Sequence, residues 1–304
     1  FVGGYLVKEL IDAGHHVVGI DNFSKYGPVS RAYDSHERYT FVEGDCKNPD
    51  LMRELIADCD QVVAGAAMIG GISYFHQFAY DLIAENERII AATFDAAIEA
   101  FQNSRLKKIN VLSSSMAFEC TNVYPTPEGA EKTAPPPKST YGFQKLAVEY
   151  FAKGALEQYG LPYTVIRPFN CVGIGEGRAL TDVDVMSGNI KLAMSHVLPD
   201  LIQKTLKGQD PLHILGEGNQ IRCYTHGADL VKGIRLCIER EEAINEDFNI
   251  STDSSTTVLE LAELVWKTIH GDAKPFRYTS DKAFEHDVQK RIPDTSKAKR
   301  VLGF

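Results

Sequence analysis

The sequence predicts an α/β protein built on a doubly wound parallel sheet, with a smaller second lobe. Five short apolar segments have the length and composition of buried strands. They centre on Val17, Phe41, Val62, Ile109 and Val165. Each is followed by a helix or a loop, as in folds whose parallel strands are joined by crossovers. We expect the sheet to occupy 1–170 and the lobe to occupy 171–304, interleaved with the sheet.

The composition is that of an ordinary globular chain. The 304 residues are 44% hydrophobic and 24% charged, and their net charge of -9 disfavours a nucleic-acid-binding surface as the main role. No apolar run approaches the roughly 20 residues that cross a bilayer, and the start is not a signal peptide. The six cysteines lack CxxC or Cys/His metal spacing. We expect free thiols, no metal site, no membrane association and a cytoplasmic location.

Residues 1–14 predict a helix that ends at Gly14, and a strand follows it. The strand from His16 ends in Asp21 and Asn22. A carboxylate at such a strand end can accept hydrogen bonds from ribose hydroxyls and repels a 2′-phosphate. The alternative is an Asx turn that ends the strand.

The next two strands also end in polar or small residues. The segment from Tyr39 leads into Asp45 and Cys46, and the segment from Gln61 leads into Gly65-Ala-Ala67. Small residues let a ligand lie close to the backbone, although they also suit plain packing of a helix on a strand.

The chemistry of the sequence is concentrated in 107–170. A buried strand runs into Ser113-Ser-Ser115, and a later strand ends in Arg167-Pro-Phe-Asn170. Between them, Tyr141 and Lys145 are four residues apart on a predicted helix and therefore share one face. We expect the Lys145 ammonium to lower the pKa of Tyr141, so that the pair can transfer a proton. The ends of parallel strands should bring these residues to one edge of the sheet.

This order of motifs resembles the extended short-chain dehydrogenase/reductase family, specifically its nucleotide-sugar epimerases and dehydratases such as UDP-glucose 4-epimerase. The resemblance runs nearly end to end and implies a Rossmann-type domain, bound NAD and a homodimer that forms through the Tyr141 helix. It makes Gly3 the last glycine of the dinucleotide fingerprint. The family pattern places a strand and two more glycines before Phe1, so we expect the natural chain to be longer.

The resemblance also assigns roles to residues. Ser115 would donate a hydrogen bond to the reacting oxygen, Tyr141 would act as the base, and Lys145 would orient the nicotinamide ribose. The expected cofactor contacts are Gly3, Asp21, Asn22, Asp45, Cys46, Gly65, Ala66, Ala67, Asn86, Ser113, Tyr141, Lys145 and Pro168. The expected substrate contacts, which suit the diphosphate and sugar of a UDP-sugar, are Ser115, Asn170, Arg222 and Arg291. We expect Arg167 to pair within the fold.

The residues after Ser115 favour one reaction within the family. Dehydratases resemble Thr-Asp-Glu at this place, whereas this chain has Ser115-Met-Ala117 and no carboxylate before Glu119. A 4-epimerase acting on a UDP-hexose or UDP-hexuronate is therefore favoured. A dehydratase, a decarboxylase, a reductase or a nucleotide-binding protein without turnover are the alternatives. Glu119-Cys120 and His226-Gly227 depart from the family pattern without an explanation in the sequence.

The remaining segments predict the second lobe. A proline-containing loop over 120–138 is placed to cover the site, and 173–197 predicts a long loop. Helices are predicted over 198–206, 229–239 and 258–270, with strands at 212–215 and 248–250.

Overall fold

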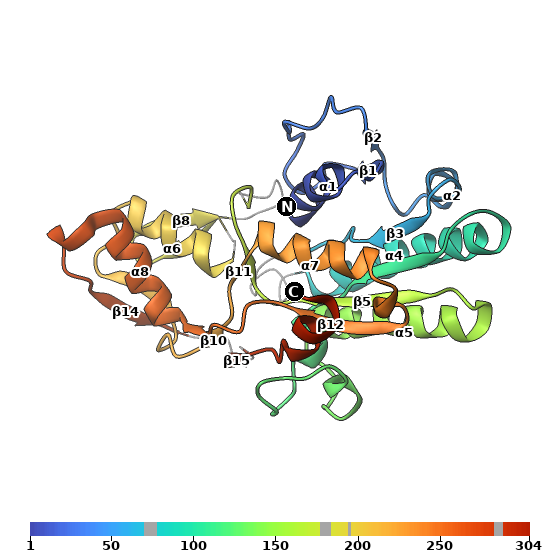
Figure 1. Ribbon diagram of the computed structural model, residues 1–304. Coiled ribbons are helices and arrows are strands. Elements are labelled where there is room, and N and C mark those ends of the chain that lie inside the picture. The colour runs from blue at the N-terminus through green and yellow to red at the C-terminus, as the bar shows by residue number, and fades with distance from the viewer. Residues whose placement is uncertain (70–77, 177–183, 194–195, 283–287) are drawn as a thin grey trace.

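A computed structural model describes residues 1–69, 78–176, 184–193, 196–282 and 288–304 and shows an α/β fold (Figure 1). The first half alternates strands and helices as predicted. Its elements are α1 (Val2–Asp12), β1 (Val17–Asp21), β2 (Tyr39–Glu43), α2 (Pro49–Ile56), β3 (Gln61–Ala64), α4 (Ala79–Asn103), β4 (Lys108–Leu112), η1 (Ser115–Phe118), η2 (Ala130–Lys132), α5 (Thr140–Tyr159), β5 (Tyr163–Pro168) and β6 (Cys171–Val172).

The second half contains shorter strands. Its elements are β7 (Asp184–Ser187), β8 (Ile190–Ala193), α6 (Val197–Leu206), β9 (Leu212–Leu215), β10 (Ile221–Arg222), β11 (Thr225–His226), α7 (Gly227–Glu239), η3 (Glu241–Ala243), β12 (Glu246–Ile250), β13 (Thr256–Thr257), α8 (Val258–His270), η4 (Gly271–Ala273), β14 (Tyr278–Asp281), β15 (Lys290–Arg291) and η5 (Ala298–Leu302). No helix among the described residues is both long enough and apolar enough to span a membrane.

The five parallel strands predicted from the sequence, together with β12, fall into two hydrogen-bonded sheets. The larger sheet has the order β12-β5-β4-β3, and β1 pairs only with β2. Among the described strands, none joins β1 to β3 by hydrogen bonds. Side chains hold the β1–β2 pair instead, because Ile20 and Val17 pack against the two cores on either side of the larger sheet. The predicted α/β fold with a doubly wound parallel sheet is therefore confirmed, with β1 and β2 as a separate hydrogen-bonded pair among the described residues.

Helices cover both faces of the larger sheet (Figure 1). On one face, α4 and α5 bury Phe94, Val148 and Ala152 against Ile109 and Val111 of β4. On the other face, α1 and α7 pack their apolar sides together and against β12. This double covering explains why β4 and β5 are buried almost along their whole length.

Local sequence fixes where the central helices begin and end. Ser139 caps α5 by accepting a hydrogen bond from the Gly142 amide, and Gly160 ends the helix with a φ of 74°. Thr257 and Glu260 form a reciprocal capping box at the start of α8. The Ser139 cap starts the Tyr141 helix directly after the loop that contains η2.

We use the name C-terminal lobe for the hairpin β7–β8 together with α6, β9, α8 and β14. Its core surrounds Trp266 and includes Leu201, Leu212 and Ile214. The hairpin corrects the prediction of a long loop over 173–197, because its strands pair in antiparallel register. Residues 177–183 and 194–195 of that predicted loop lie outside the described residues. The chain then returns to the larger sheet, where β12 pairs with β5.

Candidate active site

The serines after β4 occupy three different positions. The Ser113 hydroxyl lies 3.0 Å from the backbone oxygen of Lys145 and 2.6 Å from Glu149 Oε1, so it ties the strand end to α5. Ser114 precedes η1 and accepts a hydrogen bond from the Met116 amide. Ser115 begins η1 and is buried. The strand end and the helix predicted from sequence therefore do meet.

Tyr141 lies partly buried in the first turn of α5, and Lys145 lies buried one turn later. The Lys145 ammonium is 5.8 Å from the centroid of the Tyr141 ring and donates a 3.1 Å hydrogen bond to the Leu112 carbonyl. Burial raises the pKa of Tyr141, and the Ser114 hydrogen bond and the Arg291 charge oppose that rise. Burial also lowers the pKa of Lys145 to about 8. The prediction that Lys145 lowers the pKa of Tyr141 is therefore wrong, because burial raises this pKa and the groups that oppose the rise are Ser114 and Arg291.

The sequence did not predict that Ser114 and Arg291 act on the Tyr141 phenol. The structure makes Ser114, rather than Ser115, its hydrogen-bonding partner, and it brings the charge of Arg291 close enough to act on the phenol. The serine triplet predicted that a serine lies near Tyr141, but it did not indicate which of the three serines contacts the tyrosine.

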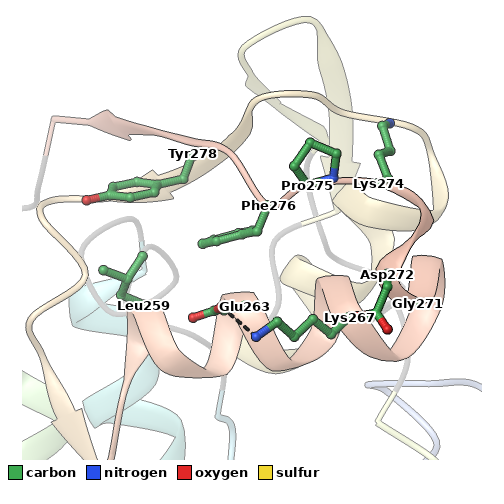
Figure 2. A pocket seen from close by; sticks show the side chains of 9 residues that line it. All are labelled: Leu259, Glu263, Lys267, Gly271, Asp272, Lys274, Pro275, Phe276 and Tyr278. Carbon is green, nitrogen blue, oxygen red and sulfur yellow. Dashed lines mark ion pairs between the residues drawn. The ribbon is translucent and has the colours of Figure 1, made fainter.

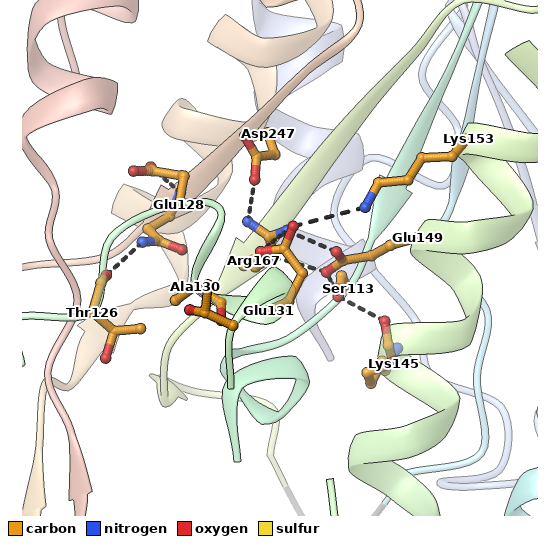
Figure 3. Close-up of polar contacts among 12 residues, drawn as sticks. Ser113, Thr126, Glu128, Ala130, Glu131, Lys145, Glu149, Lys153, Arg167 and Asp247 are labelled. Atoms are coloured by element: carbon orange, nitrogen blue, oxygen red, sulfur yellow. Dashed lines mark hydrogen bonds and ion pairs between the residues drawn. The ribbon is translucent and has the colours of Figure 1, made fainter. Parts of the chain in front are cut away.

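A buried ionic network is centred on Arg167, close to Ser113 and Lys145 (Figure 3). Arg167 on β5 is 1% exposed and forms two 2.7 Å hydrogen bonds with the carboxylate of Glu149 on α5. It also contacts Asp247 on β12 at 2.5 Å and Glu131 on η2 at 3.3 Å. Lys153 and Lys297 approach the outer sides of Glu131 and Asp247. Lys297 also contacts Glu246 at 2.7 Å, so the network contains three cations and four carboxylates.

This network fixes the relative positions of the elements near the predicted catalytic residues. We use the name catalytic wall for β4, α5, β5 and β12. Glu149 joins Arg167 to Ser113, while the Arg167 guanidinium also packs over the Phe118 ring of η1 at 4.7 Å. The attraction of Glu149 raises the pKa of Arg167 although burial opposes it. The prediction that Arg167 pairs within the fold is confirmed. Its partner Glu149 follows Lys145 by four residues, and this spacing could have predicted that both lie on the same face of α5.

Several of the groups that the sequence assigns to NAD lie at strand ends and at the start of α1. Asp21 is exposed at the end of β1, where its carboxylate accepts a 2.7 Å hydrogen bond from the Phe23 amide. Phe1 gives α1 no side-chain cap, and a Cβ added at Gly3 would meet no described atom within 4 Å. A glycine in the first turn of a helix and a carboxylate at the end of the next strand suit a pyrophosphate and a ribose. These residues fit NAD.

Other predicted cofactor residues are occupied by contacts within the protein. The Asn86 side chain holds both the amide and the carbonyl of Met68, at 2.6 and 3.0 Å. The Asp45 carboxylate accepts from the Lys47 amide. Cys46 is buried, and burial raises its pKa to about 11. Asn22 accepts a hydrogen bond from Ser24.

The remaining predicted cofactor residues lie near the ends of β3 and β5. Gly65 to Ala67 follow β3, where a Cβ at Gly65 would lie 3.2 Å from Leu112. Pro168 ends β5 and pairs with Ile250 of β12. Their contacts with NAD, like those of the other predicted residues, stay predictions.

The two arginines predicted to bind a diphosphate lie side by side. Arg222 on β10 is in register with Arg291 on β15. The Arg222 guanidinium donates to the backbone carbonyls of Ile221, Gln289 and Val288, so it supports the segment that leads to Arg291. Asn170 joins this region to β5, because its carbonyl accepts from the Thr225 amide. Their contacts with substrate stay predictions.

The structure explains the unexpected pair His226-Gly227. His226 caps α7 by accepting from the Ala228 amide, and its ring packs edge-on against Tyr5 at 5.6 Å. A Cβ at Gly227 would lie 2.8 Å from the Tyr5 ring, so glycine is needed for this contact between α7 and α1. The pair serves packing of the fold.

A separate hollow of about 410 Å³ lies on the C-terminal lobe, along α8 (Figure 2). Phe276 and Tyr278 stack above it at 5.9 Å, and Leu259 lies at one end. Its charged residues include Glu263 and Lys267, which pair with each other on the surface. None of the predicted catalytic residues lines this hollow.

Comparisons with known proteins identify the family of this chain. A family model described as the NAD dependent epimerase/dehydratase family matches residues 1–251. The chain is 28% identical over 317 residues to the uncharacterized UDP-glucose epimerase YtcB of Bacillus subtilis, covering 100% of this chain and 89% of that protein. It is 24% identical over 329 residues to a UDP-N-acetyl-alpha-D-glucosaminuronate decarboxylase of Bacillus cytotoxicus, with coverage of 100% and 89%.

The fold is also found in solved structures. A UDP-glucose 4-epimerase from Thermotoga maritima, solved with UDP-glucose, matches with a TM-score of 0.80 and 27% identity. The match covers 100% of this chain and 90% of that structure. Epimerases and a decarboxylase therefore both occur among the similar proteins.

Proposed function

Since this chain belongs to the NAD dependent epimerase/dehydratase family and has NAD as its cofactor, we propose that it is a nucleotide-sugar 4-epimerase. The substrate class is a UDP-hexose or a UDP-hexuronate. The sugar is oxidised at C4, the 4-keto sugar turns in the site, and the hydride returns to its other face. The reaction has no net redox change.

The chain's own residues carry the proton in this proposal. When bound, NAD supplies the acceptor and donor of the C4 hydride. Tyr141 takes the proton of the C4 hydroxyl as the hydride leaves and gives it back when the hydride returns. Ser115 donates a hydrogen bond to the same oxygen, and Ser114 and Arg291 favour the phenolate of Tyr141. Lys145 holds the nicotinamide ribose, and Arg222 and Arg291 bind the diphosphate.

The observation that carries the choice of reaction is the position of Glu119. Elimination of water at a neighbouring carbon needs a carboxyl group that can exchange a proton with the substrate. Glu119 is the first carboxylate after Ser115, and its Oε2 accepts hydrogen bonds from the amide and hydroxyl of Ser139. A carboxylate held in this way caps a helix, which favours epimerisation over dehydration.

The decarboxylase is the second candidate, because one relative bears that name over the full length of this chain. It shares the oxidation at C4 and differs in losing carbon dioxide from a uronic acid. Incubation of the protein with UDP-, GDP- and dTDP-sugars separates the candidates. A product of unchanged mass with inverted C4 coupling by proton NMR is expected, and loss of carbon dioxide or water would overturn the epimerase.

Replacing the base tests the mechanism. Tyr141→Phe should lower kcat by at least about 10³-fold, because the phenyl ring cannot accept the proton. Bound NAD, measured after release from the folded protein, and the circular-dichroism spectrum should both stay unchanged. An unaltered kcat would contradict the role of Tyr141.

Two serine variants identify the hydrogen-bond donor. Ser115→Ala should lower kcat more than Ser114→Ala, since Ser114 acts on Tyr141 rather than on the substrate. The reverse order would assign the donor role to Ser114.

The proposal extends to the organisation of the enzyme. Residues 1–170 form the NAD-binding domain, and 171–304 form most of the substrate-binding lobe. The protein works in the cytoplasm as a homodimer through α5, where Phe143 and Tyr150 expose 49% and 63% of their surface. Light scattering of the purified protein measures the oligomeric state.

A further inference from the structure

Glu119 joins η1, which carries Ser115, to α5, which carries Tyr141. It directly follows η1, which begins with Ser115, and its amide donates to the Met116 carbonyl. Its carboxylate reaches across to Ser139, where one oxygen accepts from the backbone amide at 2.9 Å and from the hydroxyl at 3.0 Å. The contact therefore links the end of η1 to the first turn of α5.

Ser139 passes the contact on to the helix that carries Tyr141. Its hydroxyl accepts a 3.0 Å hydrogen bond from the Gly142 amide while it donates to Glu119. Tyr141 lies between these two residues in the first turn. Movement of the Ser139 cap would therefore change the position of the phenol.

Close packing makes this junction specific. A Cβ added at Gly142 would lie 2.8 Å from Glu119 Oε2, 2.8 Å from Pro137 Cβ and 2.9 Å from the Met116 carbonyl oxygen. Only a glycine lets η1 and α5 approach this closely without displacing one of them. The carboxylate and the glycine together determine how far Ser115 lies from Tyr141.

Electrostatics favours the same arrangement. The first amides of α5 carry the positive end of the helix dipole, which attracts a carboxylate. The negative charge of Glu119 is half-buried and satisfied by two donors. The hydrogen bonds come from neutral groups, so an amide oxygen in the same place could accept them too.

We propose that Glu119 is a positioning residue that sets the distance between Ser115 and Tyr141 by capping α5 from the end of η1. This inference rests on the proposed function and adds a residue that acts through Ser139 without touching the substrate. The position of Glu119 in the fold then determines kcat rather than the affinity for the sugar.

The chain contains a matched control. Glu260 accepts hydrogen bonds from the amide and hydroxyl of Thr257 at 2.7 and 2.9 Å and so caps α8 in the C-terminal lobe. Glu260→Ala removes the same kind of cap from a helix that carries no predicted catalytic residue. Its effect on helix capping should match that of Glu119→Ala, whereas its effect on catalysis should not.

The experiment compares Glu119→Ala, Glu119→Gln and Glu260→Ala. Glu119→Ala should lower kcat about 30-fold, because small displacements of reacting groups have large effects on rate, with KM changed less than threefold. Glu119→Gln should keep kcat within about threefold of the natural protein, because its amide oxygen restores both hydrogen bonds. Glu260→Ala should leave kcat within about twofold.

Hydrogen exchange provides a readout that needs no sugar. Mass spectrometry of peptides that cover 139–145 should show faster exchange in Glu119→Ala and natural rates in Glu119→Gln and Glu260→Ala. Unchanged exchange in Glu119→Ala, or an unchanged kcat, would overturn the positioning role.

The two proposals fail in different ways. If Glu119→Gln loses as much kcat as Glu119→Ala while its exchange stays natural, Glu119 acts as an acid and the positioning role is wrong. If the natural protein converts no sugar, the proposed function is wrong, and faster exchange in Glu119→Ala alone still supports the link between η1 and α5.

Discussion

Among the described residues, Trp266 and Arg167 are the two largest side chains that are fully buried, and they lie in interiors of different chemistry. Trp266 in the C-terminal lobe is surrounded by Leu201, Leu212, Ile214 and other apolar side chains. Arg167 in the catalytic wall is surrounded by Glu149, Glu131 and Asp247. An apolar core tolerates small displacements, whereas a buried charge needs each partner at hydrogen-bonding distance.

The difference teaches how each region serves its place in the enzyme. Apolar contacts are non-directional and hold the lobe together. The ionic network is directional, and it joins β4, α5, β5 and β12 at the strand ends where Ser115 and Tyr141 lie. Exact placement of catalytic groups is the property that such a network can provide, at the cost of sensitivity to any missing partner.

The largest effect is expected when the network loses its central charge. Arg167→Met should lower the free energy of unfolding by about 4 kcal/mol, because Glu149 and Glu131 would stay buried without their partner. Urea unfolding followed by circular dichroism measures this loss. The urea midpoint measured by Trp266 fluorescence should shift less than the midpoint measured by circular dichroism, since the single tryptophan reports on the lobe.

A neighbouring lysine serves as the control for that variant. Lys153 contacts Glu131 at 3.7 Å, and its side chain is 35% exposed. Lys153→Met removes a cation from the same network but from its solvated side, so its effect should be much smaller. Equal losses in the free energy of unfolding for Arg167→Met and Lys153→Met would mean that burial of the guanidinium does not determine the size of the effect.

An intermediate effect that depends on pH is expected at Asp247. Burial acts to raise the pKa of Asp247, but the Arg167 charge and the Lys297 hydrogen bond outweigh it and hold the pKa at about 2. The carboxylate therefore contributes stability above its unfolded pKa near 4, and this contribution is lost as the pH falls toward 2. Asp247→Asn should lower the free energy of unfolding by about 2 kcal/mol at pH 7 and by about half of that at pH 3.

The apolar core supplies the comparison for this pH dependence. Trp266→Phe removes indole volume and the hydrogen bond from Nε1 to the Lys274 carbonyl. Its loss of stability, measured by circular dichroism, should be the same at pH 7 and pH 3 because no titrating group is removed. If the loss of stability depended on pH to the same extent in Asp247→Asn and Trp266→Phe, the two interiors would not differ in the way proposed.

The smallest effect is expected at the surface of the lobe. Lys267→Gln removes the ion pair with Glu263, in which the two side chains are 60% and 45% exposed. Solvent screens such a pair, so the urea midpoint should not shift measurably. A large shift of the urea midpoint would show that the stability of the C-terminal lobe also depends on ion pairs.

The sequence determined the local structure and the family of this protein. Helix caps at Ser139 and Thr257, glycine ends such as Gly160 and the apolar periodicity of the strands depend on neighbouring residues. The order of the serine triplet, Tyr141 and Lys145 predicted the fold class, the NAD cofactor and the meeting of β4 with α5. Such features can be read from a sequence because their partners lie a few residues away.

Only the tertiary structure decided how distant groups act on one another. Glu119 meets Ser139 across 20 positions, and Arg167 meets Asp247 across 80, so no spacing rule connects them. The raised pKa of Tyr141 likewise follows from burial by surrounding elements, which outweighs the opposing effects of Ser114 and Arg291. Burial and long-range pairing depend on how the elements pack, and packing sets both the dielectric environment and the distance between charges.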